Sequence, residues 1–294
     1  MRNYLFFKIF ICLSVLCCFG CSESSNGDWY VNYMQLNYIN SKYKGKNQKI
    51  AIIDSGLSIE YQNFYGPQII YKYNCIDGND DISDENGHGT EMTLLILGDE
   101  ERNIKGISPK SDVIILKVVD ESGRTNSNLL LNALVKAEQQ NADVVNISLG
   151  TYKENESIAK QIEKMNKKNI TIVSSVGDDG NRDIMFPSSL ESAIAVTALD
   201  ENGNIYEESN TSKKKIIAFP GVKIMPLNSG EGEEITGTSY ACAIATGYIS
   251  LLKEHYKKNE IKYDNDYILK ELGKLVNPDN DKIDYKKLFD VKQN

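Results

Sequence analysis

Histidine and cysteine are scarce in this chain of 294 residues. It contains only two histidines, His88 and His255, and four of its six cysteines lie within the first 21 residues. The two cysteines farther along, Cys75 and Cys242, are too few for a disulfide framework. A fold of this size needs no such bridge, so we expect both to be free thiols.

Basic residues are also in deficit. Lys and Arg number 33 against 41 Asp and Glu, which gives a formal net charge of −8. Because Arg2 and Lys8 are the only charged residues up to position 21, residues 22–294 carry −10 (31 against 41). Such an acidic body argues against nucleic acid as a partner and weakly favours cationic substrates. No internal repeat or low-complexity linker divides residues 22–294, which we interpret as one domain of a monomeric protein.

The apolar run Ile9–Phe19 is too short to span a bilayer comfortably. It follows Arg2 and Lys8, and it ends at Gly20-Cys21, after which the sequence turns polar. This order of a basic segment, an apolar segment and a small-residue site is typical of a secretory signal peptide. Residues 1–21 are therefore predicted to direct export from the cell.

Cys21 stands in a sequence that resembles the lipoprotein box of bacteria. It follows Gly20 and precedes Ser22, although Cys18 occupies the place where such boxes usually have Leu. In a lipoprotein the cysteine thiol carries diacylglyceryl and becomes the first residue after cleavage. The resemblance implies a protein tethered through Cys21 to the extracellular side of the bacterial cell membrane. An ordinary signal peptide with free secretion is the alternative.

Five short apolar runs, rich in β-branched residues, are predicted as strands. They are nearly continuous rather than alternating, which suits strands buried on both faces of a sheet. Helical patterns at Asn126–Gln140 and Ser157–Lys168 lie between them, and a third runs from Ser239 through Leu252 to a polar end at Lys253–His255. Alternating strands and helices indicate a parallel, doubly wound α/β sheet. The five runs are Lys49–Ile53, Val113–Val119, Ala142–Ser148, Ile170–Ser174 and Ala193–Thr197.

Three short motifs follow one another along the chain: Asp54-Ser-Gly, Gly-His88-Gly-Thr and Gly-Thr-Ser239. Each alone is typical of a turn or a helix cap. Together they supply what nucleophilic catalysis needs, since a serine requires a base and the base requires an acid to hold its tautomer. His88 is flanked by glycines and is predicted in a loop, whereas His255, in a polar helix end, is predicted to be solvated. We therefore interpret Asp54, His88 and Ser239 as a catalytic triad.

The order Asp, His, Ser resembles that of the subtilases, and the resemblance extends over nearly all of residues 26–294. Asn146-Ile-Ser-Leu-Gly150 is similar to the substrate-binding strand of that family, and Phe219-Pro-Gly-Val222 to its Ala-Pro-Gly-Val segment. Phe186-Pro187 matches a pair that is cis in relatives. The resemblance implies a subtilisin-like α/β fold, with a predominantly parallel seven-stranded sheet and helices on both faces. It also implies serine endopeptidase activity on peptides, with no cofactor required for the chemistry.

One segment departs from the family pattern. Where relatives read Ala-Ala-Gly-Asn-Glu-Gly, this chain has Ser174-Ser-Val-Gly-Asp-Asp-Gly180, and Asp178 replaces the Asn whose amide donates to the oxyanion. An ionised Asp has no proton to donate, and losing one such donor costs about 10²–10³ in rate. Three interpretations stay open. Asp178 is protonated, or the enzyme is slow and relies on the Ser239 N–H and the Thr238 hydroxyl, or the chain is inactive.

The resemblance also assigns a substrate-binding region. Met185 is expected to narrow the floor of the pocket for the residue that precedes the cut. Asp179 and Asp183 lie in the segment that lines this pocket in relatives, where they would either attract a Lys or Arg or stay solvated. The predicted substrate-binding residues are Ser148, Leu149, Gly150, Ser175, Val176, Gly177, Asp179 and Met185.

Other departures from the family are milder. Tyr240 stands where Met is common after the serine, and Glu91-Met92 replaces the usual His-Val after Gly-His-Gly-Thr. Structural calcium is common in the family. The acidic clusters of this chain, such as Asn79-Asp-Asp81, lack any specific ligand spacing, so no particular metal site is predicted and structural calcium stays open.

The recognisable domain begins directly after the signal, which leaves no room for the propeptide that many secreted subtilases carry. A small lipid-anchored subtilase of this kind resembles the proteases that remove the leader from lantibiotic precursors after export. Two alternatives are a general extracellular subtilase and a catalytically weak lipoprotein that holds peptides in its cleft.

Overall fold

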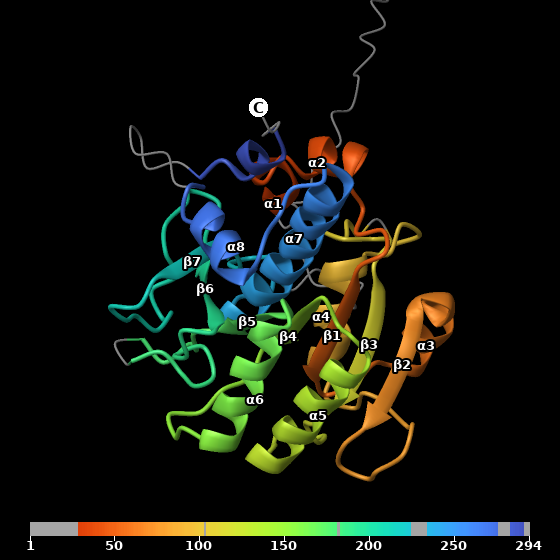
Figure 1. Cartoon of the computed structure of the whole chain (residues 1–294). Coiled ribbons are helices and arrows are strands. Elements are labelled where there is room, and N and C mark those ends of the chain that lie inside the picture. The colour runs from red at the N-terminus through yellow and green to blue at the C-terminus, as the bar shows by residue number, and fades with distance from the viewer. Residues whose placement is uncertain (1–28, 103, 181–182, 225–233, 276–282, 291–294) are drawn as a thin grey trace, which may run out of the picture.

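The computed structural model describes residues 29–102, 104–180, 183–224, 234–275 and 283–290. The predicted signal peptide, residues 1–21 with Cys21, lies outside these ranges. One sheet has the strand order β2-β3-β1-β4-β5-β6-β7, and every neighbouring pair is parallel (Figure 1). The strands are β1 (Lys49–Asp54), β2 (Ile69–Asn74), β3 (Asp112–Lys117), β4 (Val144–Ile147), β5 (Thr171–Ser175), β6 (Ala193–Leu199) and β7 (Ile216–Pro220).

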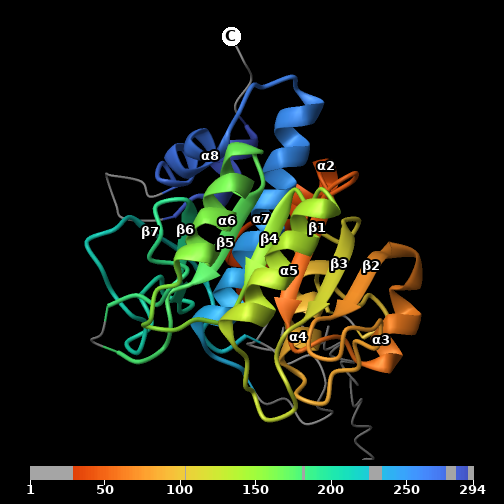
Figure 2. The same cartoon turned by 60° about the horizontal axis from the view of Figure 1, so that its bottom comes forward.

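Helices cover both faces of the sheet, and Figure 2 shows α5 and α6 side by side on one of them. Ile50 and Ile52 of β1 join the apolar core that includes α4 and α7. Ala51 and Ile53 point the other way, into the core that includes α5 and α6. The helices are α1 (Trp29–Tyr33), α2 (Leu36–Lys42), α3 (Ile59–Phe64), α4 (His88–Leu97), α5 (Ser127–Gln139), α6 (Glu156–Lys167), α7 (Thr238–Lys258) and α8 (Asn265–Leu272), with 3₁₀ turns η2 (Gly66–Gln68) and η3 (Tyr285–Phe289).

The predicted fold class is confirmed, and the five predicted runs correspond to β1, β3, β4, β5 and β6. The two strands that no apolar run indicated, β2 and β7, are the edges of the sheet. In β2 only Asn74 is buried, and Ile70 is 42 % exposed. An edge strand of this kind lacks the continuous apolar pattern that identifies a central one.

The helices α5 and α6 lie within one residue of their predicted bounds. The side chain of Asn126 accepts hydrogen bonds from the N–H groups of Asn128 and Leu129 and so caps α5. Asn155 caps α6 in the same way. These caps explain where both helices begin, because Asn satisfies N–H groups that have no partner inside the helix.

His255 is buried rather than solvated, so that prediction is wrong. It is 2 % exposed, and its Nδ1 lies 2.8 Å from the hydroxyl of Tyr43. The helix α7 extends to Lys258, beyond the polar end predicted at Lys253–His255, and most of its length runs through the core. Lys253 is also buried, and its ammonium donates to the carbonyl groups of Asp143 and Asn169 at 2.8 and 2.7 Å. The polar residues Lys253 and His255 of α7 are therefore buried and hydrogen-bonded, and the helix becomes exposed only at Lys257 and Lys258.

Three strand ends bring the predicted site residues to one edge of the sheet. Asp54 is the last residue of β1, Ser148 follows β4, and Gly177 comes two residues after β5. Since β1, β4 and β5 are parallel neighbours, these positions share the carboxyl edge, where ligands bind in open α/β sheets. The start of α7 meets the same edge.

Cys75 and Cys242 are buried free thiols, as predicted. No helix in the described ranges is long and apolar enough to cross a bilayer.

Candidate active site

Asp54 and His88 form a hydrogen-bonded pair at the end of β1. Asp54 is 2 % exposed, and the N–H of Ser55 donates to its Oδ1 at 2.8 Å. The same oxygen lies 2.7 Å from Nδ1 of His88, a typical separation for a carboxylate and an imidazole. With the carboxylate at Nδ1, the other ring nitrogen, Nε2, is left to exchange a proton with a reacting group.

His88 is the first residue of α4, so its prediction as a loop residue is wrong. Gly87 precedes the helix with a left-handed φ of 93°. Gly89 lies so close to the end of β1 that a Cβ there would be 2.5 Å from the carbonyl oxygen of Gly56. Only glycine accommodates this approach without a clash, which lets α4 begin directly beside Asp54.

The electrostatic surroundings of His88 favour its charged form. Burial by itself lowers the pKa of the imidazole, but the charge and hydrogen bond of Asp54, with contributions from Glu91 and Asp84, raise that pKa to about 9. The neutral imidazole, which is the form able to act as a base, therefore becomes dominant only above about pH 9.

Ser239 lies in the first turn of α7, beside the end of β4. Its Oγ donates to the carbonyl oxygen of Ser148 at 3.3 Å, and the hydroxyl of Ser148 donates back to the Ser239 carbonyl at 3.2 Å. Among the described residues no hydrogen bond joins Ser239 to His88, although the ring of Tyr240 lies 6.2 Å from the His88 ring. Nucleophile–base hydrogen bonds are often loose without substrate and tighten in the complex. The structure thus brings the three predicted residues into one region, with the serine turned toward Ser148.

Asp178 contacts the start of the same helix. Its two carboxylate oxygens accept from the backbone N–H of Thr238 at 2.9 and 3.2 Å. The Thr238 hydroxyl in turn accepts from the N–H of Gly177 at 3.2 Å. Burial against the helix raises the pKa of Asp178, the hydrogen bonds from Thr238 lower it, and Glu208 and Asp179 add to the rise, so that the net direction is upward. The N–H of Ser239 has no partner within the described residues and is free to donate to an oxyanion.

Met185 lies between the two predicted substrate-binding segments, Ser148–Gly150 and Ser175–Gly177, which form the two walls of this region. A Cβ added to Gly150 would be 2.8 Å from the Met185 Cβ, and one added to Gly177 would be 3.0 Å from the Met185 Sδ. The backbone of Met185 is held on both sides, since its N–H donates to Val176 and its carbonyl accepts from the hydroxyl of Ser188. Met185 therefore occupies the space between the walls. The neighbouring Phe186–Pro187 bond is cis, as the resemblance implies.

A second connection between the walls was not anticipated from the sequence. The hydroxyl of Tyr152 donates to the carboxylate of Asp179, and the side-chain amide of Asn210 donates to the Tyr152 oxygen at 3.0 Å. Asn210 also accepts from the N–H of Asp179 at 3.1 Å. No short-range pattern could have indicated this group, because its members lie in three loops separated by up to 58 residues. Asp183, which was predicted in the same region, is exposed.

A cavity of about 400 Å³ adjoins the segment that follows β4. Its lining combines apolar side chains with the polar start of α5 and includes the predicted binding residues Leu149 and Gly150. Such a mixed concave surface suits an apolar side chain of a bound peptide. The lining residues are Thr125, Asn126, Ser127, Leu130, Leu149, Gly150, Thr151, Ile158 and Phe186.

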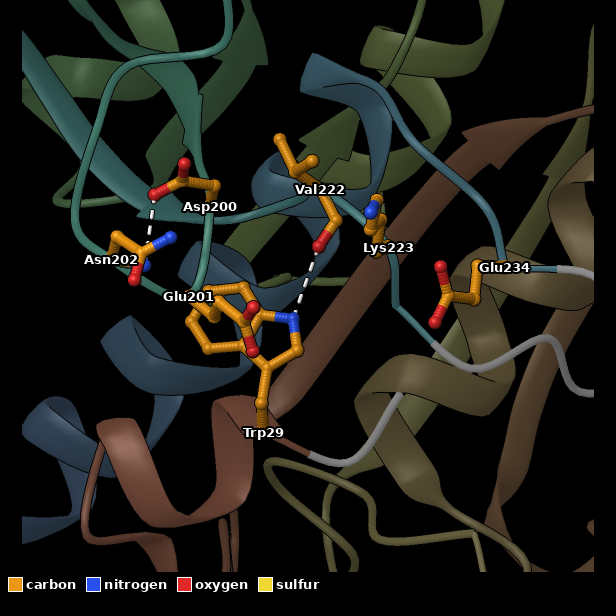
Figure 3. Close-up of a pocket in the computed structure, with 7 residues that line it drawn as sticks. All are labelled: Trp29, Asp200, Glu201, Asn202, Val222, Lys223 and Glu234. Atoms are coloured by element: carbon orange, nitrogen blue, oxygen red, sulfur yellow. Dashed lines mark hydrogen bonds between the residues drawn. The ribbon is translucent and has the colours of Figure 1, made fainter. Parts of the chain in front are cut away.

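Another pocket, of about 170 Å³, contains none of the predicted site residues (Figure 3). The indole N–H of Trp29 donates to the carbonyl oxygen of Val222 at 3.0 Å and closes one side of it. Its other lining residues are Asp200, Glu201, Asn202, Lys223 and Glu234. In the described ranges, no group of three or more His, Cys, Asp or Glu side chains is arranged to hold a metal ion.

A parallel α/β sheet with a carboxylate–imidazole pair and a helix-borne serine at its carboxyl edge has the architecture of a serine protease. The model of the subtilase family, peptidase S8, matches residues 45–272. The chain therefore belongs to the subtilase family and is a serine-type endopeptidase that acts on peptides.

Curated relatives agree with this assignment. The major intracellular serine protease of Bacillus subtilis (strain 168) is 28% identical over 228 residues, which cover 74% of this chain and 71% of the relative. Subtilisin DY of Bacillus licheniformis is 26% identical over 73% of this chain and 79% of its own length. Thermitase of Thermoactinomyces vulgaris is 26% identical over 71% of this chain and 76% of its own length.

Proposed function

We propose that this subtilase is an exported, lipid-anchored endopeptidase whose catalytic residues are Asp54, His88 and Ser239. The observation that carries the proposal is the 2.7 Å contact between Asp54 Oδ1 and His88 Nδ1, at the same sheet edge as the start of α7. Ser239 attacks the peptide carbonyl, and Nε2 of His88 takes its proton and passes it to the leaving amine. Asp54 holds the tautomer of His88 and stabilises the imidazolium.

The developing negative charge on the peptide oxygen is stabilised by the first turn of α7. The N–H of Ser239 points out of a helix N-terminus, where the partial positive charge of the helix favours an anion. The Asp178 carboxylate lies beside the same helix N-terminus, where it supplies negative charge instead of an N–H donor for the oxyanion. The proposed enzyme is therefore slow, and an intact acid–imidazole pair favours this over an inactive chain.

The substrate is proposed to be a peptide that carries a removable leader, such as a lantibiotic precursor, cut at one position. The narrowed space between Gly150 and Gly177 supports restricted cleavage, because a large side chain before the cut would collide with Met185. Incubating the full chain with leader-bearing precursor and with casein tests this. One cut at the leader junction with casein left intact is expected. Broad digestion of casein would favour a general extracellular protease, and no cleavage of either would favour a peptide-binding lipoprotein.

Replacing Met185 with Gly is expected to open the pocket to bulky residues. Removing the side chain clears the space between the walls, so cleavage after Phe or Tyr should rise about tenfold or more relative to cleavage after Ala. Peptide-library profiling measures the change.

Asp183→Asn provides the matched control, because it alters the exposed acidic rim and leaves Met185 in place. Asp179 is also exposed, and this acidic rim supports a preference for cationic peptides. The control should weaken selection of Lys and Arg without admitting aromatic residues. Equal profiles for wild type and Met185→Gly would show that Met185 does not limit the pocket.

Anchoring through Cys21 is proposed from the sequence around it and has its own test. Cells that express the full chain are fed a radiolabelled fatty acid, and the protein is recovered from the membrane fraction. The wild type should be labelled and Cys21→Ala should not, since the thiol is the acceptor of diacylglyceryl. Cys18→Ala, which keeps Cys21, is the control and should still be labelled. Equal labelling of wild type and Cys21→Ala would contradict lipidation at Cys21 and favour a secreted protein without a lipid anchor.

A further inference from the structure

We propose that Glu91 and Tyr240 form a positioning pair that joins the two helices of the catalytic site and tunes the basicity of His88. The proposal rests on the assignment of His88 as the catalytic base. Both residues depart from the usual family sequence, and the structure shows that they contact each other. The hydroxyl of Tyr240 donates to Oε2 of Glu91 at 3.1 Å.

The location of the pair gives it access to both reacting side chains. Glu91 lies three residues after His88 in α4, so the two side chains share one face of that helix. Tyr240 follows Ser239 in α7, and its ring packs beside the imidazole at 6.2 Å between centroids. One hydrogen bond thus connects the helix that carries the base with the helix that carries the nucleophile, next to the point where the proton must pass.

The pair is also half-buried, which strengthens its electrostatic effect. Burial raises the pKa of Glu91, whereas the hydrogen bond from Tyr240 and the charge of His88 lower it, and the net direction is upward. Burial and the charge of Glu91 both raise the pKa of the Tyr240 phenol, so it stays a proton donor. The negative charge of Glu91 stabilises the imidazolium and is one of the contributions that raise the pKa of His88.

The other charged groups near His88 form hydrogen bonds with other partners. Asp54 at the end of β1 bonds Nδ1 directly, and Asp84 accepts from the N–H groups of Gly87 and Thr90. From α7 the phenol ring of Tyr240 packs beside the imidazole, and Asp178 is bonded to the N–H of Thr238. Glu91 is thus the carboxylate near the base that is linked to the nucleophile helix.

Two variants separate the charge from the link. Glu91→Gln keeps an oxygen that can accept from Tyr240 but removes the negative charge, so the imidazolium becomes less stable. The midpoint of the rise of kcat/KM with pH should fall from about 9 by about one pH unit. Tyr240→Phe keeps the ring and the charge of Glu91 but loses the hydrogen bond. It should lower the plateau kcat about threefold to tenfold with little change in KM, because the base and the nucleophile are less well aligned.

Glu85→Gln is the matched control. It removes a carboxylate three residues before His88 that is exposed and paired with Lys117 at 3.1 Å. Its pH midpoint should move much less than that of Glu91→Gln. An unchanged midpoint in Glu91→Gln, or an equal shift in both variants, would overturn the electrostatic role of the pair. An unchanged plateau kcat in Tyr240→Phe would overturn the positioning role.

Nuclear magnetic resonance gives a readout that does not depend on proteolysis. The chain holds only two histidines, and burial lowers the pKa of His255 while that of His88 is raised, so their titrations are well separated. In the full chain labelled at histidine, Glu91→Gln should lower the His88 midpoint by the same amount as the kinetic midpoint. A lowered midpoint without any peptidase activity would support the pair and reject the proposed function. An unchanged His88 midpoint in Glu91→Gln, in an enzyme that cleaves peptides, would reject the pair and support the proposed function.

Discussion

Ser239→Ala is expected to abolish proteolysis, lowering kcat by about four to six orders of magnitude. The substitution removes the only atom that forms the bond to the peptide carbonyl in the proposed mechanism. It leaves the helix start and the N–H of residue 239 in place. Within the described residues, the substitution removes the hydrogen bond from Ser239 Oγ to the carbonyl of Ser148 at 3.3 Å. This bond is worth only about 1 kcal/mol, so the protein should fold normally.

A fluorophosphonate probe measures this directly, because it reacts with an activated serine. The wild type should be labelled on a peptide that contains Ser239, as mass spectrometry of the digested protein would show. Ser250→Ala is the control on the same helix. It removes buried contacts to Ser108 and Ser111 at 3.1 and 3.0 Å but keeps the nucleophile, and it should still be labelled. Undiminished labelling or cleavage in Ser239→Ala would remove this serine from the mechanism.

Asp178→Asn is expected to raise kcat/KM at neutral pH by about tenfold to a hundredfold. The ionised carboxylate repels the oxyanion that forms beside it, whereas the amide of Asn has N–H groups to donate. The amide oxygen can still accept from the N–H of Thr238, so the contact that holds Asp178 to the helix start is preserved. Fold and helix geometry should therefore be unchanged while the electrostatic effect reverses.

The ratio of variant to wild-type rates should depend on pH. Because the pKa of Asp178 is raised, its carboxyl takes up a proton as the pH falls and can then donate to the oxyanion. The advantage of Asn should thus be largest at high pH and shrink toward acidic pH. Asp179→Asn removes the neighbouring charge, which is bonded to Tyr152, and should change the rate far less. A slower Asp178→Asn enzyme would show that the carboxylate contributes to catalysis as it stands.

Local sequence patterns predicted the central strands well and the edges poorly. The run Lys49–Ile53 is apolar because β1 is buried on both faces, and it corresponds to β1 within one residue. The strand β7 has Ile216 and Ala218 partly exposed, and its weaker pattern went undetected. The helix α4 was missed for another reason. Its first residues, His88-Gly-Thr, have poor helix propensity, and tertiary packing that buries nearly all of its other residues overrides that weakness.

The residues of the site differ in how far the sequence could predict them. Asp54, His88, Ser239 and Asp178 lie in short motifs that could be recognised along the chain, and the structure brings them together. The contact between Tyr240 and Glu91 could not be predicted, because the two residues are 149 positions apart and nothing in either motif indicates a partner. The burial of His255 also escaped prediction, since its polar neighbours in sequence are not its neighbours in space.

By itself, the sequence determined five of the seven strands with the helices α5 and α6 between them, the motifs that supply an acid, an imidazole and a hydroxyl, and the Asp at the position of an oxyanion donor. Periodicity and turn chemistry are local properties, so they can be read from residues close together in the chain. The tertiary structure alone decided which side chains meet: Asp54 with His88, Asp178 with the start of α7, and Met185 between two glycines. Such contacts depend on strand order and helix direction, because a parallel sheet collects at one edge residues that are far apart in sequence.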